Sequence, residues 1–458
     1  MRSGPVRILP VAGLLLAIAA LTTWLVAGVG VLTGRQVPLY FAVEGVCWTL
    51  FAAAVLLLRR VPDKAVPALV LLGALLLGAA GASGQPTIST DSARYNWDGI
   101  VQDAGISPYA HVPADAALAP LRPDWLFPAG TERADGTVDC PGLRARPTEQ
   151  VGAPGTICTV INRPQVPTIY PPVAEALFAL ARIAVPHDVA YLPMQLLGLA
   201  AVLLTTALLL RALRTTGRDP RHAAVFGWCP FVGMEAVTNA HVDAWAALLA
   251  LAATLLVTRG RLVAGGAVLG LAIATKFLPV LIAPPLGRRR PWLIGLAALG
   301  AVVVVYLPHV LAVGPSVIGY LPGYLNEEGY DGGTRSALLS AVLPPAATTP
   351  VAAVLLAALA LVLLIRTDPR EPWAAQTLMV GAALVILSPG YGWYSLLLVP
   401  FLVMSGRWEW FGVVIVLSLL GFQSHQLWAF RGVLLAAALL PVAGALLRRR
   451  APRKLIDA

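Results

Sequence analysis

AVPALVLLGALLLGAAGA, residues 65–82, is an apolar run without a charged residue, and STDSARYNWDGIVQDAGISPY, residues 89–109, follows it closely. A run of this length and composition is expected to form a helix in a lipid bilayer. Membrane helices commonly end in one or two polar residues, whereas here Asp91, Arg94 and Asp98 lie among aromatic side chains. The two segments together predict a membrane span that leads into a site of chemistry at the membrane surface.

The composition extends this interpretation to the whole chain. Of its 458 residues, 58% are hydrophobic and only 12% are charged, which is about half the charged fraction of an ordinary soluble domain. Apolar runs of spanning length recur along the sequence. We therefore predict an all-α, polytopic integral membrane protein with about twelve transmembrane helices.

The expected spans are separated by short polar or basic connections. Residues 262–287 differ, because two short apolar pieces flank Lys276 and arginines lie on both sides of the pair. This pattern predicts a re-entrant or broken pair of helices with Lys276 near the turn. The first run is too long for a secretory signal, and we expect it to be retained. The predicted spans are 8–33, 38–58, 65–82, 189–211, 222–238, 242–258, 291–313, 350–366, 372–388, 394–406, 409–426 and 429–447.

The net charge of +10 comes mainly from Lys and Arg at the ends of apolar segments. The positive-inside rule puts all of these ends in the cytoplasm in one consistent topology, with both termini cytoplasmic. The excess of Lys and Arg then reflects the orientation of the chain in the membrane. We expect membrane lipid, but no nucleic acid, as a partner. The predicted location is the cell membrane.

Two polar segments are expected outside the cytoplasm. Residues 83–170 form a long loop after the third span, with nine acidic and six basic residues, and residues 314–349 form a second loop. Cys140 and Cys158 both lie in the first loop, where an exported environment favours a disulfide over two free thiols.

The expected parts of the chain are an N-terminal hairpin (1–64), a membrane core with both loops (65–405), C-terminal helices (406–447) and a basic cytoplasmic tail (448–458).

The first loop carries residues suited to catalysis. Asp91 lies close enough to the third span to fold back to the lipid boundary, where a carboxylate can act as general base on a hydroxyl. Arg94 can hold a phosphate or orient a carboxylate. Tyr95 and Tyr109 suit either an interfacial aromatic belt or the face of a sugar ring. The loop ends in TIYPP, whose prolines predict a helix over 173–185 that brings Tyr170 near the same surface.

A second polar group lies where one expected span ends outside and the next begins. It comprises Glu235, Asn239, His241 and Asp243. Ionisable residues at membrane depth are costly and tend to be functional. His241 and Asp243 have a weak metal-ligand spacing without a clear third ligand, so we expect no metal and no cofactor. Binding of a polar ligand, or helix capping by Asn239, is the favoured interpretation.

Further candidates lie near the same side of the membrane. Lys276 either snorkels to water or faces an anionic phosphate. Arg335 lies in the second loop, and Trp393 and Tyr394 are interfacial anchors or sugar contacts. Cations, a carboxylate and aromatic rings at one face are what transfer of a glycosyl group from a lipid-phosphate donor requires.

Several short motifs, in this order, resemble those of known enzymes. They are Asp91 with GISPY (105–109), TIYPP (168–172), the P…E…N-x-H-x-D run (230–243), G-L-A-x-x-x-K-x-x-P (270–279) and WYSLLLVPFL (393–402). The chain from 85 to 405 resembles the polytopic glycosyltransferases of superfamily C that use polyprenyl-phosphate sugars. It is most similar to glycosyltransferase family 87 and to the actinobacterial α-1,6-mannosyltransferases of lipomannan assembly.

The resemblance implies a catalytic Asp in the first outer loop. Asp91 matches that position and Asp98 is a second candidate. It also implies inversion at the sugar carbon, so that a β-linked mannosyl donor gives an α-mannoside. The superfamily contains both metal-dependent and metal-free members. In this superfamily the catalytic loop usually follows the first span, whereas here two further spans come before it. These are either an added N-terminal hairpin or an error in span assignment.

Residues and resemblance together predict an inverting polyprenyl-phosphate-mannose-dependent α-mannosyltransferase that acts on a glycan or glycolipid outside the cytoplasm. The alternative is a secondary transporter, which would have charges near the bilayer midplane and two similar halves. The expected roles are catalysis for Asp91 and Asp98, donor-phosphate binding for Arg94, Lys276 and Arg335, and sugar or acceptor binding for Tyr95, Tyr109, Tyr170, Glu235, Asn239, His241, Asp243, Trp393 and Tyr394.

Overall fold

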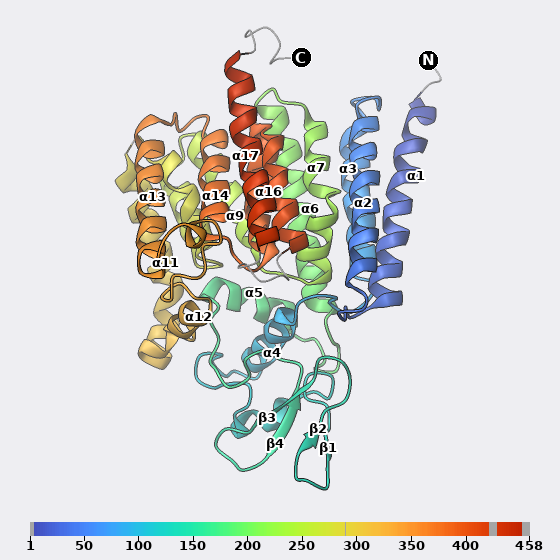
Figure 1. Ribbon diagram of the computed structural model, residues 1–458, viewed down its shortest axis with the longest axis vertical. Coiled ribbons are helices and arrows are strands. Elements are labelled where there is room, and N and C mark those ends of the chain that lie inside the picture. The colour runs from blue at the N-terminus through green and yellow to red at the C-terminus, as the bar shows by residue number, and fades with distance from the viewer. Residues whose placement is uncertain (1–3, 289, 421–427, 451–458) are drawn as a thin grey trace. The chain divides into compact units, whose positions relative to one another are not determined.

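The computed structural model describes residues 4–288, 290–420 and 428–450 (Figure 1). These residues are predominantly helical and form two compact units. The first unit is Met1–Leu249, Gly270–Phe277 and Ala298–Pro322, and the second is Ala250–Leu269, Leu278–Ala297 and Gly323–Ala458.

Several described helices are long and apolar enough to cross a membrane. Six pass by length and composition, and a seventh is possible if the pair Pro230–Thr238 and Asp243–Thr258, bent by 115°, counts as one span. Shorter apolar helices fall below the length of a full span. The membrane class is thus supported, but the expected count of about twelve is not confirmed. The six are Arg7–Val29, Val37–Leu58, Leu192–Thr215, Pro291–Glu327, Pro345–Arg366 and Trp428–Arg448.

In the first unit, α1 packs against α2 and α3, and α3 packs against α6. The runs predicted at 38–58, 65–82 and 189–211 are helical. A Cβ on Gly198 would lie 1.8 Å from the Ala236 carbonyl oxygen. Only glycine at this position therefore lets α6 pack against the segment that contains Ala236. The helices are α1 Gly4–Thr23, α2 Val37–Leu58, α3 Val66–Gly81, α4 Asp91–Asp103, α5 Pro172–Arg182 and α6 Leu192–Thr215.

The span predicted at 222–238 is wrong as a continuous helix. Cys229 is extended, and Pro230, which has no N–H group to continue a helix, starts a new segment. A second break follows at Ala240, whose φ of +56° is a left-handed conformation. The pieces are α7 Ala224–Gly227, α8 Pro230–Val232, the π-helix η4 Gly233–Thr238 and α9 Asp243–Thr258.

Residues 83–170 are folded and are not an irregular loop. α4 packs against α5, and a small core that includes Trp97, Leu126 and Ile161 ties α4 to the rest of the segment. Figure 1 shows α4, α5 and four short strands together beyond the ends of α1, α2, α3 and α6. The strands pair as antiparallel hairpins, β1 Thr131–Glu132 with β2 Val138–Asp139 and β3 Arg146–Glu149 with β4 Thr156–Thr159.

Two sequence features of this segment can be compared directly with the structure. Cys140 and Cys158 are joined by a disulfide with their Cα atoms 5.6 Å apart. The helix expected at 173–185 is confirmed as α5, which begins at Pro172 and ends at Arg182.

In the second unit, α13 packs against α14, α14 against α15, and α16 against α17.

Residues 262–287 are divided between the two units. Within them, α10 ends at Ile273, Lys276 follows, and the chain continues in 3-10 turns. Residues 421–426 of the predicted span 409–426 and residues 451–458 of the predicted tail lie outside the described residues. The remaining helices of the chain are α10 Leu262–Ile273, α11 Pro291–Val313, α12 Leu321–Glu327, α13 Pro345–Arg366, α14 Trp373–Leu387, α15 Leu398–Ser405, α16 Phe411–Leu420 and α17 Trp428–Arg450.

Candidate functional site

Asp91 is the first residue of α4, where a carboxylate is favoured by the helix dipole. The backbone that leads into it is held by a side chain from far along the sequence. Asn239 Oδ1 accepts hydrogen bonds from the N–H groups of residues 87, 88 and 89 at 3.2, 3.2 and 3.4 Å. Arg144 also donates to the Ser89 carbonyl oxygen at 3.1 Å. Four bonds therefore fix the position of the Asp91 backbone.

The Asp91 carboxylate has a different partner on each oxygen. Asn162 Nδ2 donates to Oδ1 at 2.8 Å. Oδ2 lies 3.8 Å from His241 Nδ1, and the Asp91 side chain keeps 18% of its surface exposed. Asp91 is thus oriented by the protein and still accessible to a substrate.

His241 lies between two carboxylates. Its Nε2 is 3.2 Å from Glu235 Oε2, and the imidazole itself has no exposed surface. Asn239 Nδ2 donates to the same Glu235 oxygen at 3.3 Å. The left-handed Ala240 separates Asn239 from His241, and such strained backbone concentrates at functional sites. Asp91, His241 and Glu235 therefore lie in a row, with the imidazole between the two carboxylates.

Asp98 faces a closed environment. Its side chain is 2% exposed and its two oxygens lie 2.8 and 2.9 Å from Arg94 Nε. Arg94 Nη1 donates to the Val166 carbonyl oxygen at 3.1 Å. Arg94 Nη2 is buried and has no hydrogen-bond partner in the described part of the chain. Asp98 is thus held in an ion pair and is not oriented toward solvent.

Glu175 of α5 completes this buried group. Thr168 Oγ1 donates to one of its oxygens at 2.7 Å, and Gln102 Nε2 donates to the other at 2.9 Å. Burial, and then the nearby Asp98 charge, raise the pKa of Glu175 well above its usual range. Burial also raises the pKa of Asp98, although the Arg94 charge opposes this rise. Two buried carboxyl groups close to each other, with only Asp98 paired to the guanidinium, favour a proton on one of them.

Aromatic rings of α4, α5 and the chain between them pack against one another. Tyr95 stacks on Phe178 with ring centres 4.5 Å apart, and Tyr170 meets Tyr95 edge to face at 4.9 Å. Tyr109 donates its hydroxyl proton to the Tyr170 carbonyl oxygen at 2.7 Å. The three tyrosines expected near Asp91 are therefore packed together as a wall.

Lys276 and Asp243 form an ion pair. Lys276 Nζ lies 2.9 Å from Asp243 Oδ2, and both residues belong to the first unit. The lysine side chain is the more exposed of the two, at 18%. Eleven of the candidates predicted from the sequence thus lie in the first unit: Asp91, Arg94, Tyr95, Asp98, Tyr109, Tyr170, Glu235, Asn239, His241, Asp243 and Lys276.

Arg335, Trp393 and Tyr394 belong to the second unit, where they form a cluster of their own. Arg335 is paired with Glu328 at 2.7 Å. Tyr391 donates to the other Glu328 oxygen at 2.7 Å and stacks on Trp393. The Arg335 charge is therefore already balanced by a carboxylate.

The sequence did not identify Asn162 or Glu175 as site residues. Asn162 lies in an irregular stretch between β4 and α5, and no pattern around it distinguishes it from other loop residues. Glu175 carried a usable signal, because it is an acidic residue within the apolar helix predicted after TIYPP.

Among the described residues, no group of three or more His, Cys, Asp and Glu has the arrangement of a metal site. The expectation that no metal is used stays a prediction from the sequence.

Replacing Asn239 with Ala is expected to destabilise the protein by about 1–3 kcal/mol, because it leaves buried backbone N–H groups unpaired. Thermal unfolding of the purified protein measures the effect. Asn96→Ala is the matched control, since Asn96 is also buried but donates to Ser92 within its own helix and accepts from Arg182 Nη1 at 3.4 Å, a side-chain donor and not a backbone N–H group. Equal losses in the two variants would contradict the role given to Asn239.

Part of the chain matches a known protein family. The family model of glycosyltransferase family 87 matches residues 168–389, which include Glu175, His241 and Lys276. Asp91 and α4 precede the matched region. No curated protein and no solved structure matches the chain. The match and the apolar helices together indicate a membrane glycosyltransferase that is similar to family 87 over residues 168–389.

Proposed function

We propose that the protein is an inverting mannosyltransferase that uses a polyprenyl-phosphate donor and acts at the extracytoplasmic face of the cell membrane. The acceptor is a hydroxyl of a glycan or glycolipid, and the product is an α-mannoside. The observation that carries the proposal is the Asp91 carboxylate, which is oriented by Asn162, adjacent to His241 and still accessible.

In the proposed reaction, Asp91 Oδ2 removes the proton from the acceptor hydroxyl. The acceptor oxygen attacks the anomeric carbon from the side opposite the phosphate. The bond between that carbon and the phosphate oxygen breaks, and polyprenyl phosphate leaves with the electron pair. The configuration at carbon changes from β to α. His241, supported by Glu235, stabilises the protonated form of Asp91 or accepts its proton.

The leaving phosphate needs cationic partners. Arg94 Nη2 is an N–H group without a partner in the described part of the chain, and Lys276 is the more exposed member of its ion pair. We propose that both contact the donor phosphate, with Lys276 moving from Asp243. Tyr170 is the proposed sugar contact, and the buried Tyr95 and Tyr109 hold it in position. Arg335 remains a predicted phosphate-binding residue, and Trp393 and Tyr394 remain predicted sugar or acceptor contacts.

The test uses proteoliposomes with the full-length protein, polyprenyl-phosphate [¹⁴C]mannose and a short mannoside acceptor. We expect label to enter the acceptor as an α-mannoside, with no loss on addition of EDTA. Failure with every polyprenyl-phosphate sugar would overturn the proposal. Accumulation of label inside the vesicles without a glycosidic product would instead support a transporter.

A further inference from the structure

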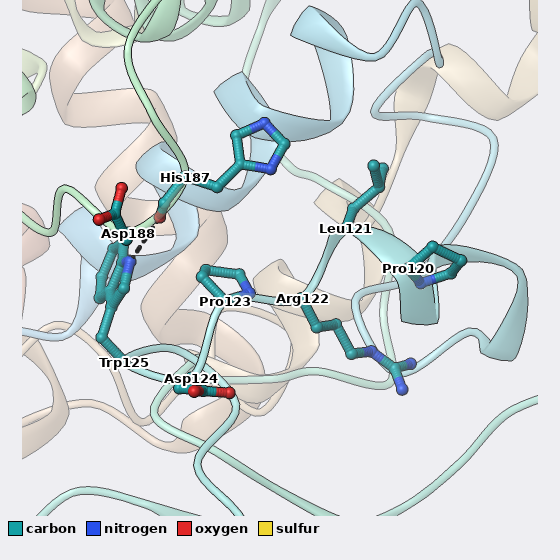
Figure 2. A pocket seen from close by; sticks show the side chains of 8 residues that line it. All are labelled: Pro120, Leu121, Arg122, Pro123, Asp124, Trp125, His187 and Asp188. Carbon is teal, nitrogen blue, oxygen red and sulfur yellow. Dashed lines mark hydrogen bonds between the residues drawn. The ribbon is translucent and has the colours of Figure 1, made fainter.

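The first unit contains a cavity of about 490 Å³ outside the group around Asp91 (Figure 2). One wall is the chain segment after the 3-10 helix Ala116–Leu121, and the other is the connection between α5 and α6. Asp91, His241 and Lys276 are not among the lining residues. The walls include Arg122, Pro123, Asp124, Trp125, His187 and Asp188.

Trp125 is held in place across this cavity. Its indole Nε1 donates to the His187 carbonyl oxygen at 2.8 Å, the bond drawn in Figure 2, so it joins the two walls. Tyr191 meets the ring edge to face with centres 5.0 Å apart. The indole is half-buried and therefore presents part of its surface at a fixed orientation.

The cavity is also connected to the helix that carries Asp91. Phe127, two residues after Trp125, meets Trp97 of α4 at 4.9 Å. Leu121 and Trp125 pack against the same core as Trp97. A ligand in the cavity would thus rest on the same folded segment as α4.

The charges around the cavity do not suit an anion. Arg122, its one lysine or arginine, donates from Nη2 to the carbonyl oxygens of Pro113 and Asp115 at 3.3 and 2.7 Å. Its guanidinium also lies over the Phe127 ring at 5.1 Å. Figure 2 shows this group directed away from Trp125. Asp124 and Asp188 are exposed, so a phosphate would meet two carboxylates.

The same surface suits a neutral polyol. Carboxylate oxygens accept hydrogen bonds from sugar hydroxyl groups. An indole face packs against the C–H groups of a pyranose ring, and pockets that combine an aromatic ring with a few polar groups are typical ligand sites. The volume is in the range of such pockets.

We propose that this cavity is an acceptor subsite that binds a sugar unit of a neutral oligosaccharide, away from the unit that receives the new sugar. The inference rests on the proposed transferase function. It places the acceptor, and not the anionic lipid donor, against residues 120–125 and 187–188 of the first unit. Longer acceptors would then bind more tightly than short ones.

Direct binding tests this without any transfer reaction. The probes are a mannose disaccharide and a longer linear mannose oligosaccharide, titrated into the full-length protein in nanodiscs by calorimetry. We expect the longer probe to bind wild type more tightly. Trp125→Ala should weaken its binding by about tenfold, equal to about 1.4 kcal/mol, and leave disaccharide binding unchanged. Asp188→Asn should act in the same direction.

Two controls separate binding from folding. Trp125→Phe keeps a ring beside Tyr191 and should retain most of the affinity, and Glu132→Gln removes an exposed charge in β1 and should have no effect. Equal affinity of wild type for both probes, equal weakening of both by Trp125→Ala, or no binding of the longer probe would each overturn the subsite. If the length dependence is found but no polyprenyl-phosphate sugar is transferred, the subsite stands and the proposed reaction fails.

Discussion

Asp91→Asn is expected to lower the rate of sugar transfer by about 10²–10⁴-fold, because it removes the proposed general base without changing the size of the side chain. Asn162 can still hydrogen-bond to the amide oxygen that replaces Oδ1, so the variant should remain folded. The measurement is transfer of labelled mannose in proteoliposomes, with the amount of folded protein matched by thermal unfolding. The loss should appear in kcat more than in the KM for donor.

Asp98→Asn is the control variant for this prediction. Asp98 is buried and paired with Arg94, whereas Asp91 is partly exposed and faces His241. We therefore expect Asp98→Asn to reduce stability while the folded fraction keeps much of its activity per molecule. A selective loss of activity in Asp98→Asn, with Asp91→Asn active, would assign the base to Asp98. Full activity in both variants would remove this segment from the catalytic centre.

Arg94→Gln is expected to destabilise the protein by about 3–5 kcal/mol, because it leaves buried carboxyl groups without their cation. Asp98 and Glu175 both depend on this guanidinium. Glu175→Gln should be much milder, since Gln can accept from Thr168 at its oxygen but carries no charge. Thermal unfolding in detergent compares the two, and a larger loss in Glu175→Gln would contradict the arrangement of charges.

The pH dependence of Glu175→Gln tests the same group. Burial raises the pKa of Glu175 in the folded protein, while the unfolded chain keeps the ordinary value of about 4.3. The folded state then holds a proton that the unfolded state releases, so wild-type stability falls as pH rises above that ordinary value. Gln has no proton to release. The unfolding temperature of Glu175→Gln relative to wild type should therefore increase from about pH 5 to about pH 8, and an unchanged difference would refute the raised pKa.

The sequence by itself determined the membrane class, the family and several helices. Apolar runs such as Val66–Gly81 are local, and the prolines of TIYPP marked the start of α5 one residue from its observed position. These features depend on neighbouring residues, so hydropathy and helix geometry are enough to predict them. Helix α4 was not predicted, although the four-residue spacing of Arg94 and Asp98 fits one helix face.

Only the tertiary structure decided how the polar side chains are paired. Asn162 reaches Asp91 across 71 residues, and Asn239 holds the residues before Asp91 across about 150. Hydropathy could not separate a continuous helix at 222–238 from one broken at Pro230, because both bury the same apolar side chains. Asp91 and Asp98 look alike in the sequence, being carboxylates seven residues apart on one short segment. Their environments differ because distant chain segments close around Asp98 and leave Asp91 open, and burial of this kind is a property of packing rather than of local sequence.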